Sequence, residues 1–251
     1  MVKVMRGRVA VVTGANSGVG QAVVRRLAGL GGTVILADIV DANAEAARLK
    51  ENGWDVSAHQ VDVTKEEEVA TLFMSAHDTH GRLDFLVNCA AVDRVNTVVD
   101  ASLEEWDWII GVNLKGVFLC CRSAIPLIAR SGGGAIVNIG STQGYQGGPS
   151  AAIYCASKGG VHQLTKCMAI DHAEEGVRVN CVAPGAIDTP MLEREMSQQP
   201  DPEEARKTAA AVPLQRIASP DEIAAVVCFL LSDDASYMTG AIVTVDGGGS
   251  A

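Results

Sequence analysis

The chain has 251 residues, of which 48% are hydrophobic and 20% charged, and its formal net charge is −10. This composition is typical of a soluble globular protein, and the length is sufficient for one large domain with a full core. The acidic balance leaves no Lys- or Arg-rich face for nucleic acid or an anionic membrane, so we expect neither as a partner.

Targeting signals and metal-ligand patterns are missing from the sequence. The first 14 residues lack the long apolar core of a signal peptide, and the apolar run 223–231 is too short to span a membrane. The seven cysteines and five histidines show no metal-ligand spacing. We therefore expect a cytoplasmic protein that holds no metal.

Short β-branched runs alternate with longer helical stretches from one end of the chain to the other. These runs are almost wholly apolar, as expected of strands that are covered on both faces. Repeated β–α units favour right-handed parallel crossovers, which predicts an α/β fold with a doubly wound, Rossmann-like parallel sheet and helices on both faces. The seven expected strands are 9–13, 33–38, 56–61, 85–88, 135–141, 178–183 and 242–245.

Several expected helices have readable starts. Thr64 with Glu67, and Ser102 with Glu105, have the spacing of capping boxes. Pro220 follows Ser219 at what we expect to be the first helical position.

No change in composition divides the chain, so residues 1–251 are expected to form a single domain. Segment 188–213 departs from the β–α rhythm, with prolines, charges and a short helix expected to open at Asp201. It follows the sixth strand, at the sheet edge where ligands bind, so we interpret it as a substrate lid. The alternative is a mobile surface excursion.

A glycine-rich turn follows the first strand directly and reads T-G-A-N-S-G-V-G over 13–20. Glycines allow a tight turn there, and the N–H groups that open the next helix would face a pyrophosphate. Three glycines alone are weak evidence, but their place between a strand and a helix near the N-terminus favours a dinucleotide site.

Asp38 closes the second strand, 20 residues after Gly18. A carboxylate at this position accepts hydrogen bonds from both ribose hydroxyls and repels a 2′-phosphate, which favours NAD over NADP. No Arg or Lys follows until Arg48. The competing interpretation is a helix N-cap, a role that Asp41 fills equally well.

Ser141, Tyr154 and Lys158 are the candidate catalytic group. Tyr154 and Lys158 are four residues apart and share a helix face, while Ser141 lies at the end of the fifth strand, where open α/β sheets place their active sites. A phenol has a pKa of about 10, and a nearby ammonium stabilises the phenolate, so we expect Lys158 to lower the pKa of Tyr154.

With these motifs in order, the sequence resembles the short-chain dehydrogenase/reductase family, in its shorter single-domain branch, over about residues 7–248. The resemblance implies that Asn113, Ser141, Tyr154 and Lys158 are catalytic. It also implies a cofactor site that contains Tyr154 and Lys158 together with Gly14, Asn16, Ser17, Gly18, Val19, Gly20, Asp38, Ile39, Asp62, Val63, Asn88, Ala90, Pro184, Gly185, Ile187 and Thr189.

The family's N-N-A-G motif is altered in this chain, where Cys89 and Ala91 replace the second Asn and the Gly. Relatives use this strand end through backbone contacts, so cofactor binding is expected to survive the change. The methyl group of Ala91 alters the local shape of the pocket.

The resemblance also implies a mechanism. Tyr154 exchanges a proton with the substrate oxygen while hydride passes between carbon and the nicotinamide. Lys158 holds the nicotinamide ribose, Ser141 hydrogen-bonds the substrate oxygen, and Asn113 supports a water that links Lys158 to solvent. We therefore expect an NAD-dependent oxidoreductase that interconverts a secondary alcohol and a ketone. Relatives pack their last helix and last strand across two-fold axes, which implies a homotetramer.

Three other functions are alternatives to a dehydrogenase. A non-catalytic dinucleotide sensor would lack the Tyr or the Lys, and a sugar-nucleotide epimerase or dehydratase would need a longer C-terminal region. Within the same family the alternative is a 3-oxoacyl-thioester reductase. Asp38 and the acidic stretch 171–176 argue against it, since such enzymes usually prefer NADPH and bind an acidic carrier through basic residues.

The substrate is expected to be an uncharged, small to medium secondary alcohol, such as a cyclic alcohol, a diol or a polyol. Apolar side chains in the lid and uncharged polar groups across the site would form its walls, with Asp93 and Arg94 as charges of opposite sign. No unpaired Arg or Lys for an anionic substrate is evident in the sequence. The expected lid residues are Met191, Leu192 and Met196, and the expected polar groups are Gln143 and Tyr145.

Overall fold

The computed structural model describes residues 5–251 and contains one seven-stranded, fully parallel sheet. The strand order is β3-β2-β1-β4-β5-β6-β7. Four strands have the predicted bounds, and the other three differ by one or two residues at an end. The strands are β1 Val9–Thr13, β2 Thr33–Asp38, β3 Val56–Gln60, β4 Phe85–Asn88, β5 Gly134–Ile139, β6 Val177–Pro184 and β7 Ile242–Val245.

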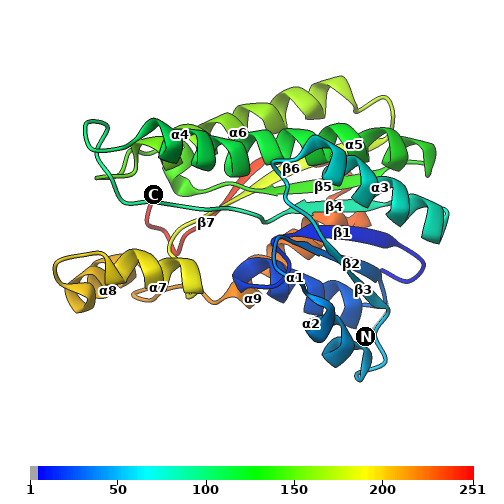
Figure 1. The fold of residues 1–251 in the computed structure, drawn as a ribbon, viewed down its shortest axis with the longest axis horizontal. Coiled ribbons are helices and arrows are strands. Elements are labelled where there is room, and N and C mark those ends of the chain that lie inside the picture. Colours follow the sequence, from blue (N-terminus) through cyan, green and yellow to red (C-terminus); the bar gives the residue numbers. More distant parts are fainter. Residues whose placement is uncertain (1–4) are drawn as a thin grey trace.

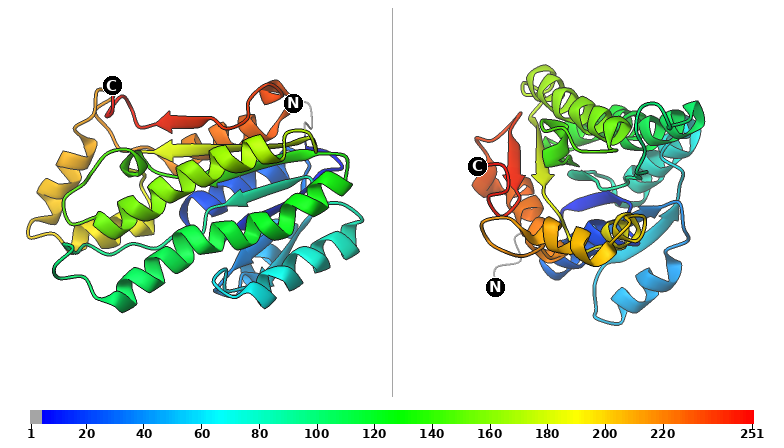
Figure 2. Two further views of the ribbon diagram at one scale, coloured as in Figure 1. Left: turned by 90° about the horizontal axis from the view of Figure 1, so that it is seen from above. Right: turned by 90° about the vertical axis from the view of Figure 1, so that its left-hand side faces the viewer.

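Helices cover both faces of this sheet (Figures 1 and 2), which confirms the predicted doubly wound fold. On one face lie α1 (Gly18–Gly29), α2 (Asn43–Lys50) and α9 (Pro220–Leu231), whose apolar side chains form one core with alternate residues of the strands. The second core lies under the helices of the other face. These are α3 (Glu66–His80), α4 (Leu103–Ile110), α5 (Val117–Arg130) and α6 (Ala152–Asp171).

The expected helix starts have mixed outcomes. Ser102 caps α4 as predicted, because its Oγ accepts the Glu105 N–H at 3.1 Å and the Glu105 carboxylate accepts the Ser102 N–H. The prediction for Thr64 and Glu67 is wrong. Helix α3 begins at Glu66, and the Thr64 hydroxyl donates instead to Asp62 at 2.7 Å. The carboxylate of Asp62 therefore binds the hydroxyl that would otherwise cap the helix.

The helical stretch Leu103–Arg130 comprises α4, a π-helical turn (Gly111–Gly116) and α5. It is long and apolar enough to cross a membrane by length and composition alone. However, 56% of its most apolar window is buried in the protein. It contacts α3, α6 and strands β4 and β5. The buried core helix of a soluble protein meets the same criteria of length and composition.

The order of the strands reverses beside β1, which pairs with both β2 and β4. The connections after β1 and β4 leave toward opposite faces, and this opens a crevice at the carboxyl ends of the two strands. Thr13 pairs with Asn88, and the Thr13 hydroxyl accepts the N–H groups of Cys89 and Ala90 at 3.2 and 3.3 Å. The glycine-rich turn and the altered N-N-A-G segment therefore lie side by side.

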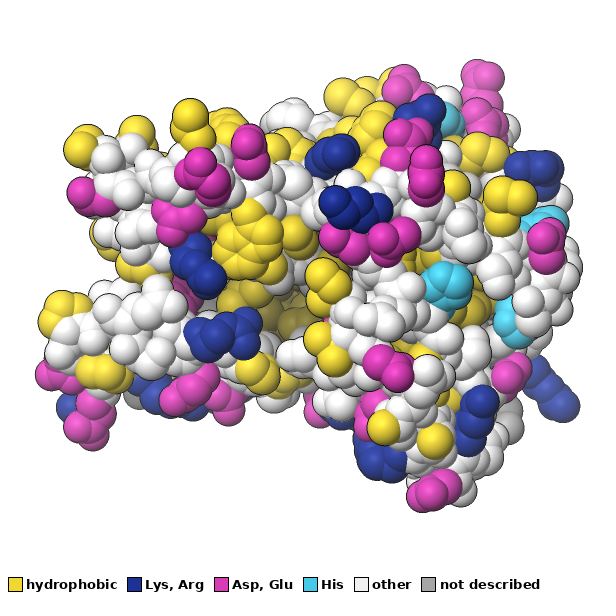
Figure 3. All heavy atoms as spheres, in the orientation of Figure 1, with side chains coloured by type: hydrophobic (Ala, Val, Ile, Leu, Met, Phe, Trp, Pro, Cys, Tyr) yellow, Lys and Arg dark blue, Asp and Glu magenta, His cyan; other side chains and the backbone are white. Residues whose placement is uncertain are grey.

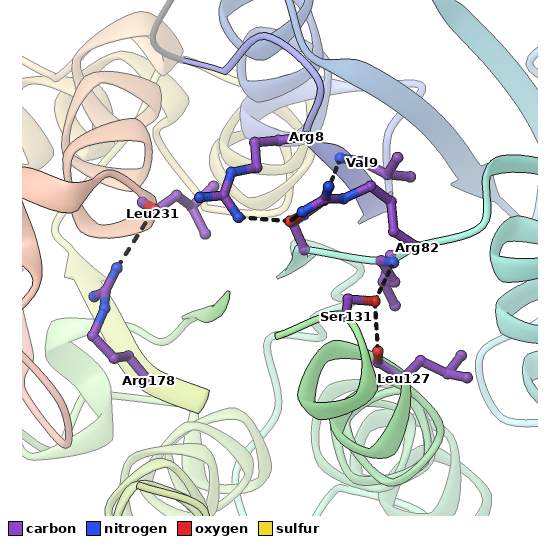
Figure 4. A network of polar contacts seen from close by, with 9 residues as sticks. Arg8, Val9, Arg82, Leu127, Ser131, Arg178 and Leu231 are labelled. Carbon is purple, nitrogen blue, oxygen red and sulfur yellow. Dashed lines mark hydrogen bonds and ion pairs between the residues drawn. The ribbon is translucent and has the colours of Figure 1, made fainter. Parts of the chain in front are cut away.

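At the amino-terminal ends of the strands, opposite the crevice, a buried carboxylate joins β1 to β4 (Figure 4). The Asp84 side chain is fully buried and contacts Arg8 at 2.8 Å and Arg82 at 2.6 Å. It also accepts the Val9 N–H at 2.9 Å. Burial raises the pKa of Asp84, but the two guanidinium groups and this N–H outweigh burial and hold that pKa below its ordinary value. This ion pair joins the starts of β1 and β4, far from the crevice.

Candidate active site

The crevice at the carboxyl edge is a cavity of about 470 Å³. From segment 188–213 it is lined by Thr189 and by α7 (Pro190–Ser197). Helix α7 and the following α8 (Pro202–Ala210) project from the body (Figure 1). Figure 3 shows the corresponding hollow in the molecular surface, with hydrophobic and basic side chains at its mouth. Most of the predicted cofactor and catalytic residues line this one cavity.

The glycine-rich turn has the close-packed geometry that only glycine allows. A Cβ on Gly20 would overlap the Gly14 carbonyl, and a Cβ on Gly14 would lie 2.7 Å from the Ala90 nitrogen. Gly14 and Gly18 both have positive φ, 61° and 49°. The turn therefore leaves its backbone open to the cavity at the start of α1, where a pyrophosphate finds N–H groups and a favourable helix dipole.

Asp38 lines the cavity at the end of β2. Its carboxylate accepts the Asn16 N–H at 2.9 Å and the Val40 N–H at 3.0 Å. Asp38 therefore braces the glycine-rich turn while it faces the cavity. Asn16 itself does not line the cavity and is held by this backbone contact, so its predicted contact with a cofactor stays a prediction.

Asn88 is also outside the cavity wall. It is buried, and its Nδ2 donates to Asn138 at 2.8 Å, which links β4 to β5. The Asn88 side chain therefore points into the core, and the predicted contact of this strand end with a cofactor stays a prediction that concerns its backbone. The cofactor residues that do line the cavity are Gly14, Ser17, Gly18, Val19, Gly20, Asp38, Ile39, Asp62, Val63, Ala90, Tyr154, Lys158, Pro184, Gly185, Ile187 and Thr189.

Ser141, Tyr154 and Lys158 meet in the same cavity. Tyr154 and Lys158 lie one turn apart on α6, and the Lys158 ammonium nitrogen is 5.5 Å from the centroid of the Tyr154 ring. Lys158 Nζ donates to the Ile139 carbonyl at 2.8 Å, which anchors it to the end of β5. Ser141 follows that strand and opens a short 3₁₀ turn, where its Oγ accepts the Gln143 N–H at 3.1 Å.

The pKa values of this group differ from the expectation. Burial raises the pKa of Tyr154 above its ordinary value, the Asp93 charge adds to the effect, and a hydrogen bond with Ser141 opposes it. Burial lowers the pKa of Lys158 to about 8. The expected fall in the Tyr154 pKa is therefore not found. Moving a phenolate out of water costs more free energy than the neighbouring groups contribute by stabilising it.

Asn113 lies in the π-helical turn behind the cavity wall and is fully buried. Its Oδ1 accepts the Val92 N–H at 2.8 Å, and its Nδ2 donates to the Val92 carbonyl and to Ser157 Oγ. The side chain thus ties the segment after β4 to α6, the helix that carries Tyr154 and Lys158. Such π turns are frequent at functional sites.

The walls predicted for a substrate need correction. Of the three apolar lid residues only Met191 lines the cavity, because Leu192 and Met196 are buried on the opposite face of α7. Gln143 and Tyr145 do not line the cavity either. The Tyr145 hydroxyl instead bonds Thr244 Oγ1 at 2.9 Å.

Arg194 and Trp108 are among the cavity residues that the sequence did not indicate. Arg194, one turn after Met191 on α7, lines the cavity and forms no ion pair within residues 5–251. Trp108 lines the opposite wall, with the guanidinium of Arg94 4.8 Å above its ring. The sequence offered no signal for either, since a lone Trp on a helix is more often a packing residue.

A tight glycine turn at a helix start, an acidic residue at the end of β2 and a Tyr–Lys pair beside the sheet edge together define a class of protein. The residues that line the cavity fit a nicotinamide dinucleotide: the N-terminus of α1 would hold its pyrophosphate, and Tyr154 and Lys158 would lie beside its reactive ring. The site is that of an oxidoreductase.

Comparison with known proteins identifies the family. The model of the family described as "Enoyl-(Acyl carrier protein) reductase" matches residues 14–250. The 3-oxoacyl-(acyl-carrier-protein) reductase FabG of Thermotoga maritima is 39% identical over 97% of this chain and 98% of its own. Meso-2,3-butanediol dehydrogenase of Serratia marcescens is 39% identical over 97% and 95%. The solved structure titled "Crystal structure of gox2181" superposes with a TM-score of 0.92 at 39% identity, covering 98% of this chain and 97% of the other.

The chain therefore belongs to the short-chain dehydrogenase/reductase family, the oxidoreductases that act on CH–OH groups with a nicotinamide cofactor.

Proposed function

We propose that the protein is an NAD-preferring dehydrogenase that interconverts a secondary alcohol and a ketone, with Tyr154 as the acid/base. The observation that carries the proposal is that Ser141, Tyr154 and Lys158 share one cavity with the glycine-rich turn and Asp38. We further propose that residues 1–251 form one domain and that segment 188–213 is its substrate lid.

When bound, the nicotinamide ring supplies the acceptor or donor of the hydride. Tyr154 exchanges a proton with the substrate oxygen, and Ser141 holds that oxygen by a hydrogen bond. Lys158 binds the nicotinamide ribose and its charge stabilises the phenolate form of Tyr154. Asn113 fixes the distance between the end of β4 and α6 through Val92 and Ser157, and supports the water that links Lys158 to solvent.

The preference for NAD rests on Asp38. A 2′-phosphate on the adenosine ribose would approach this carboxylate, and no Arg or Lys lines the cavity beside it within the described chain. Repulsion of this kind exceeds about 1.4 kcal/mol, so we expect at least tenfold preference for NAD over NADP.

An uncharged substrate is favoured by the charge balance at the mouth. Arg94 and Arg194 share a small side pocket with Asp93 and Glu195, so that positive and negative groups are equal in number there, although Arg194 forms no ion pair among the described residues. Burial raises the pKa of both carboxyl groups. A substrate with its own net charge would disturb this balance. Small cyclic alcohols, diols and polyols fit the proposal, and the butanediol dehydrogenase relative supports it.

Reduction of a 3-oxoacyl thioester is the alternative, and the Thermotoga maritima relative favours it. Against it stands Asp38, which lines the cavity and disfavours NADPH. The acidic stretch 171–176 precedes the start of β6, at the end of the sheet opposite the cavity, so it does not bear on carrier binding.

We also propose a cytoplasmic homotetramer. Large apolar side chains remain exposed on the helices that flank the sheet, including Trp106, Phe118, Ile170 and Phe229. Light scattering at micromolar concentration is expected to give a closed oligomer, and a monomer of 26.1 kDa would contradict the proposal.

The experiment that tests the proposed function is a rate survey with NAD and NADP side by side. The panel contains cyclic alcohols, diols, polyols, hydroxy acids and, in the reductive direction, 3-oxoacyl thioesters. The highest kcat/KM is expected for an uncharged secondary alcohol with NAD. A best rate on a carboxylate or a carrier-bound thioester would contradict the substrate assignment, and equal use of the two cofactors would contradict the role of Asp38.

A further inference from the structure

Helix α6 carries a buried histidine that the proposed mechanism does not use. His162 lies one turn after Lys158 and two turns after Tyr154, on the buried face of the helix. It is 4% exposed, and its Nε2 atom has no hydrogen-bond partner among residues 5–251. His162 does not line the cofactor cavity. A buried polar group without a partner is costly, so its ring has to be held there by other contacts.

Those contacts are with the turn that carries Ser141. A Cβ on Gly140 would lie 2.5 Å from His162 Nε2, and a Cβ on Gly144 would lie 2.7 Å from His162 Nδ1. Neither glycine has a positive φ, so close approach of the ring, rather than backbone conformation, requires glycine at both positions. The imidazole therefore occupies the space that these two glycines leave open.

The turn has a second attachment through Tyr145. The Tyr145 ring lies 5.7 Å from the His162 ring, and its hydroxyl bonds Thr244 Oγ1 in β7 at 2.9 Å. Segment 140–145 is thus held between α6 and β7. Ser141 lies between the two glycines, and its Oγ is already oriented by the Gln143 N–H within this turn.

We propose that His162 is a positioning residue for the reaction, whose ring holds the Gly140–Gly144 turn so that the Ser141 hydroxyl faces Tyr154. This inference rests on the proposed function, since it gives Ser141 a catalytic role. Burial, with Lys158 and Lys166, lowers the pKa of His162 to about 4, which keeps the ring uncharged beside the Lys158 ammonium at neutral pH.

A double-mutant cycle between His162 and Ser141 tests the proposal. His162→Ala is expected to lower kcat about tenfold, with KM for NAD unchanged within about twofold, because the ring is outside the cofactor cavity. In a Ser141→Ala background the same change is expected to lower kcat by less than about twofold. His162→Asn, which removes the Cε1 and Nε2 atoms that approach the two glycines and keeps a polar side chain, gives a milder variant if the alanine form does not fold. Gln163→Ala, at the adjacent exposed position, is the control.

A second test enlarges the side chain at Gly144 and then reduces the one at His162, which gives an independent readout. Gly144→Ala alone is expected to lower kcat, because its methyl group would overlap the imidazole, and adding His162→Ala is expected to restore part of the loss. Additive effects of His162→Ala and Ser141→Ala, or a loss confined to thermal stability, would overturn the proposal. If Ser141→Ala itself left kcat unchanged, the proposed function would fail instead.

Discussion

Lys158 and Tyr154 are held at a fixed separation by α6, with the ammonium nitrogen 5.5 Å from the centre of the phenol ring. The hydrogen bond of Lys158 to the Ile139 carbonyl keeps this charge at the end of β5. The phenol is nevertheless buried, and burial and Asp93 together raise its pKa. A raised pKa favours the protonated phenol, the form that donates a proton to a ketone.

The first prediction concerns Asp93. Its negative charge raises the pKa of Tyr154, so Asp93→Asn is expected to lower that pKa and to move the rising limb of the pH–rate profile for alcohol oxidation toward lower pH. Below the limb the oxidation rate is expected to increase about threefold. Asp107→Asn, at an exposed position on α4, is the control. A limb that moves to higher pH, or does not move, would show that Tyr154 is not the group that titrates.

The second prediction concerns the cofactor. Asp38→Asn removes the charge while it keeps an oxygen for the backbone N–H groups of Asn16 or Val40. The ratio of kcat/KM for NAD to that for NADP is expected to fall about tenfold. Asp41→Asn, an exposed neighbour that bonds only Asn43 among the described residues, is expected to leave the ratio unchanged. An unaltered ratio in Asp38→Asn would mean that the 2′-position is recognised elsewhere.

The third prediction concerns stability at the other edge of the sheet. Asp84→Asn leaves Arg8 and Arg82 without their buried partner, and because both arginines are partly exposed the free energy of unfolding is expected to fall by about 1–3 kcal/mol. The active site is distant, so kcat measured well below the melting temperature is expected to be unchanged. Denaturant unfolding of both proteins measures the difference.

The ion pairs of Asp84 with Arg8 and Arg82 also make the free energy of unfolding depend on pH. The pKa of Asp84 is depressed in the folded protein, so its contribution to stability is present above the ordinary value of 3.8 and is lost as the pH falls through the lower folded value. The stability difference between the wild type and Asp84→Asn is therefore expected to shrink on acidification below about pH 4. A difference that grows on acidification would contradict this account.

The strands were predictable because parallel strands that are covered on both faces are apolar along their buried part, as residues 9–12 and 34–37 are. The glycine-rich turn, Asp38 and the Tyr154–Lys158 pair were also predictable. Their spacing along the chain is set by local geometry, either one turn of a helix or the end of a strand.

The walls of the substrate pocket were not predictable, because they depend on which face of α7 packs against the body. Met191 and Arg194 face the cavity, whereas Leu192 and Met196 are buried. The sequence places all four residues on one short amphipathic helix and leaves its rotation open. Arg194 was missed for this reason.

The roles of His162 and Trp108 were hidden for a related reason. Each is an ordinary helical residue until the tertiary fold places it, His162 against two glycines of a distant turn and Trp108 beneath Arg94. The rise in the Tyr154 pKa likewise depends on burial, which periodicity alone does not measure.

The most direct test of the account is to compare turnover and cofactor binding in Tyr154→Phe and the wild type. The change removes the titrating hydroxyl and almost no volume, so kcat for oxidation of the best secondary alcohol with NAD is expected to fall at least about a hundredfold. The dissociation constant for NADH, measured by fluorescence titration, is expected to stay within about threefold of the wild-type value. Near-normal turnover in Tyr154→Phe would contradict the central claim that Tyr154 is the acid/base of this enzyme.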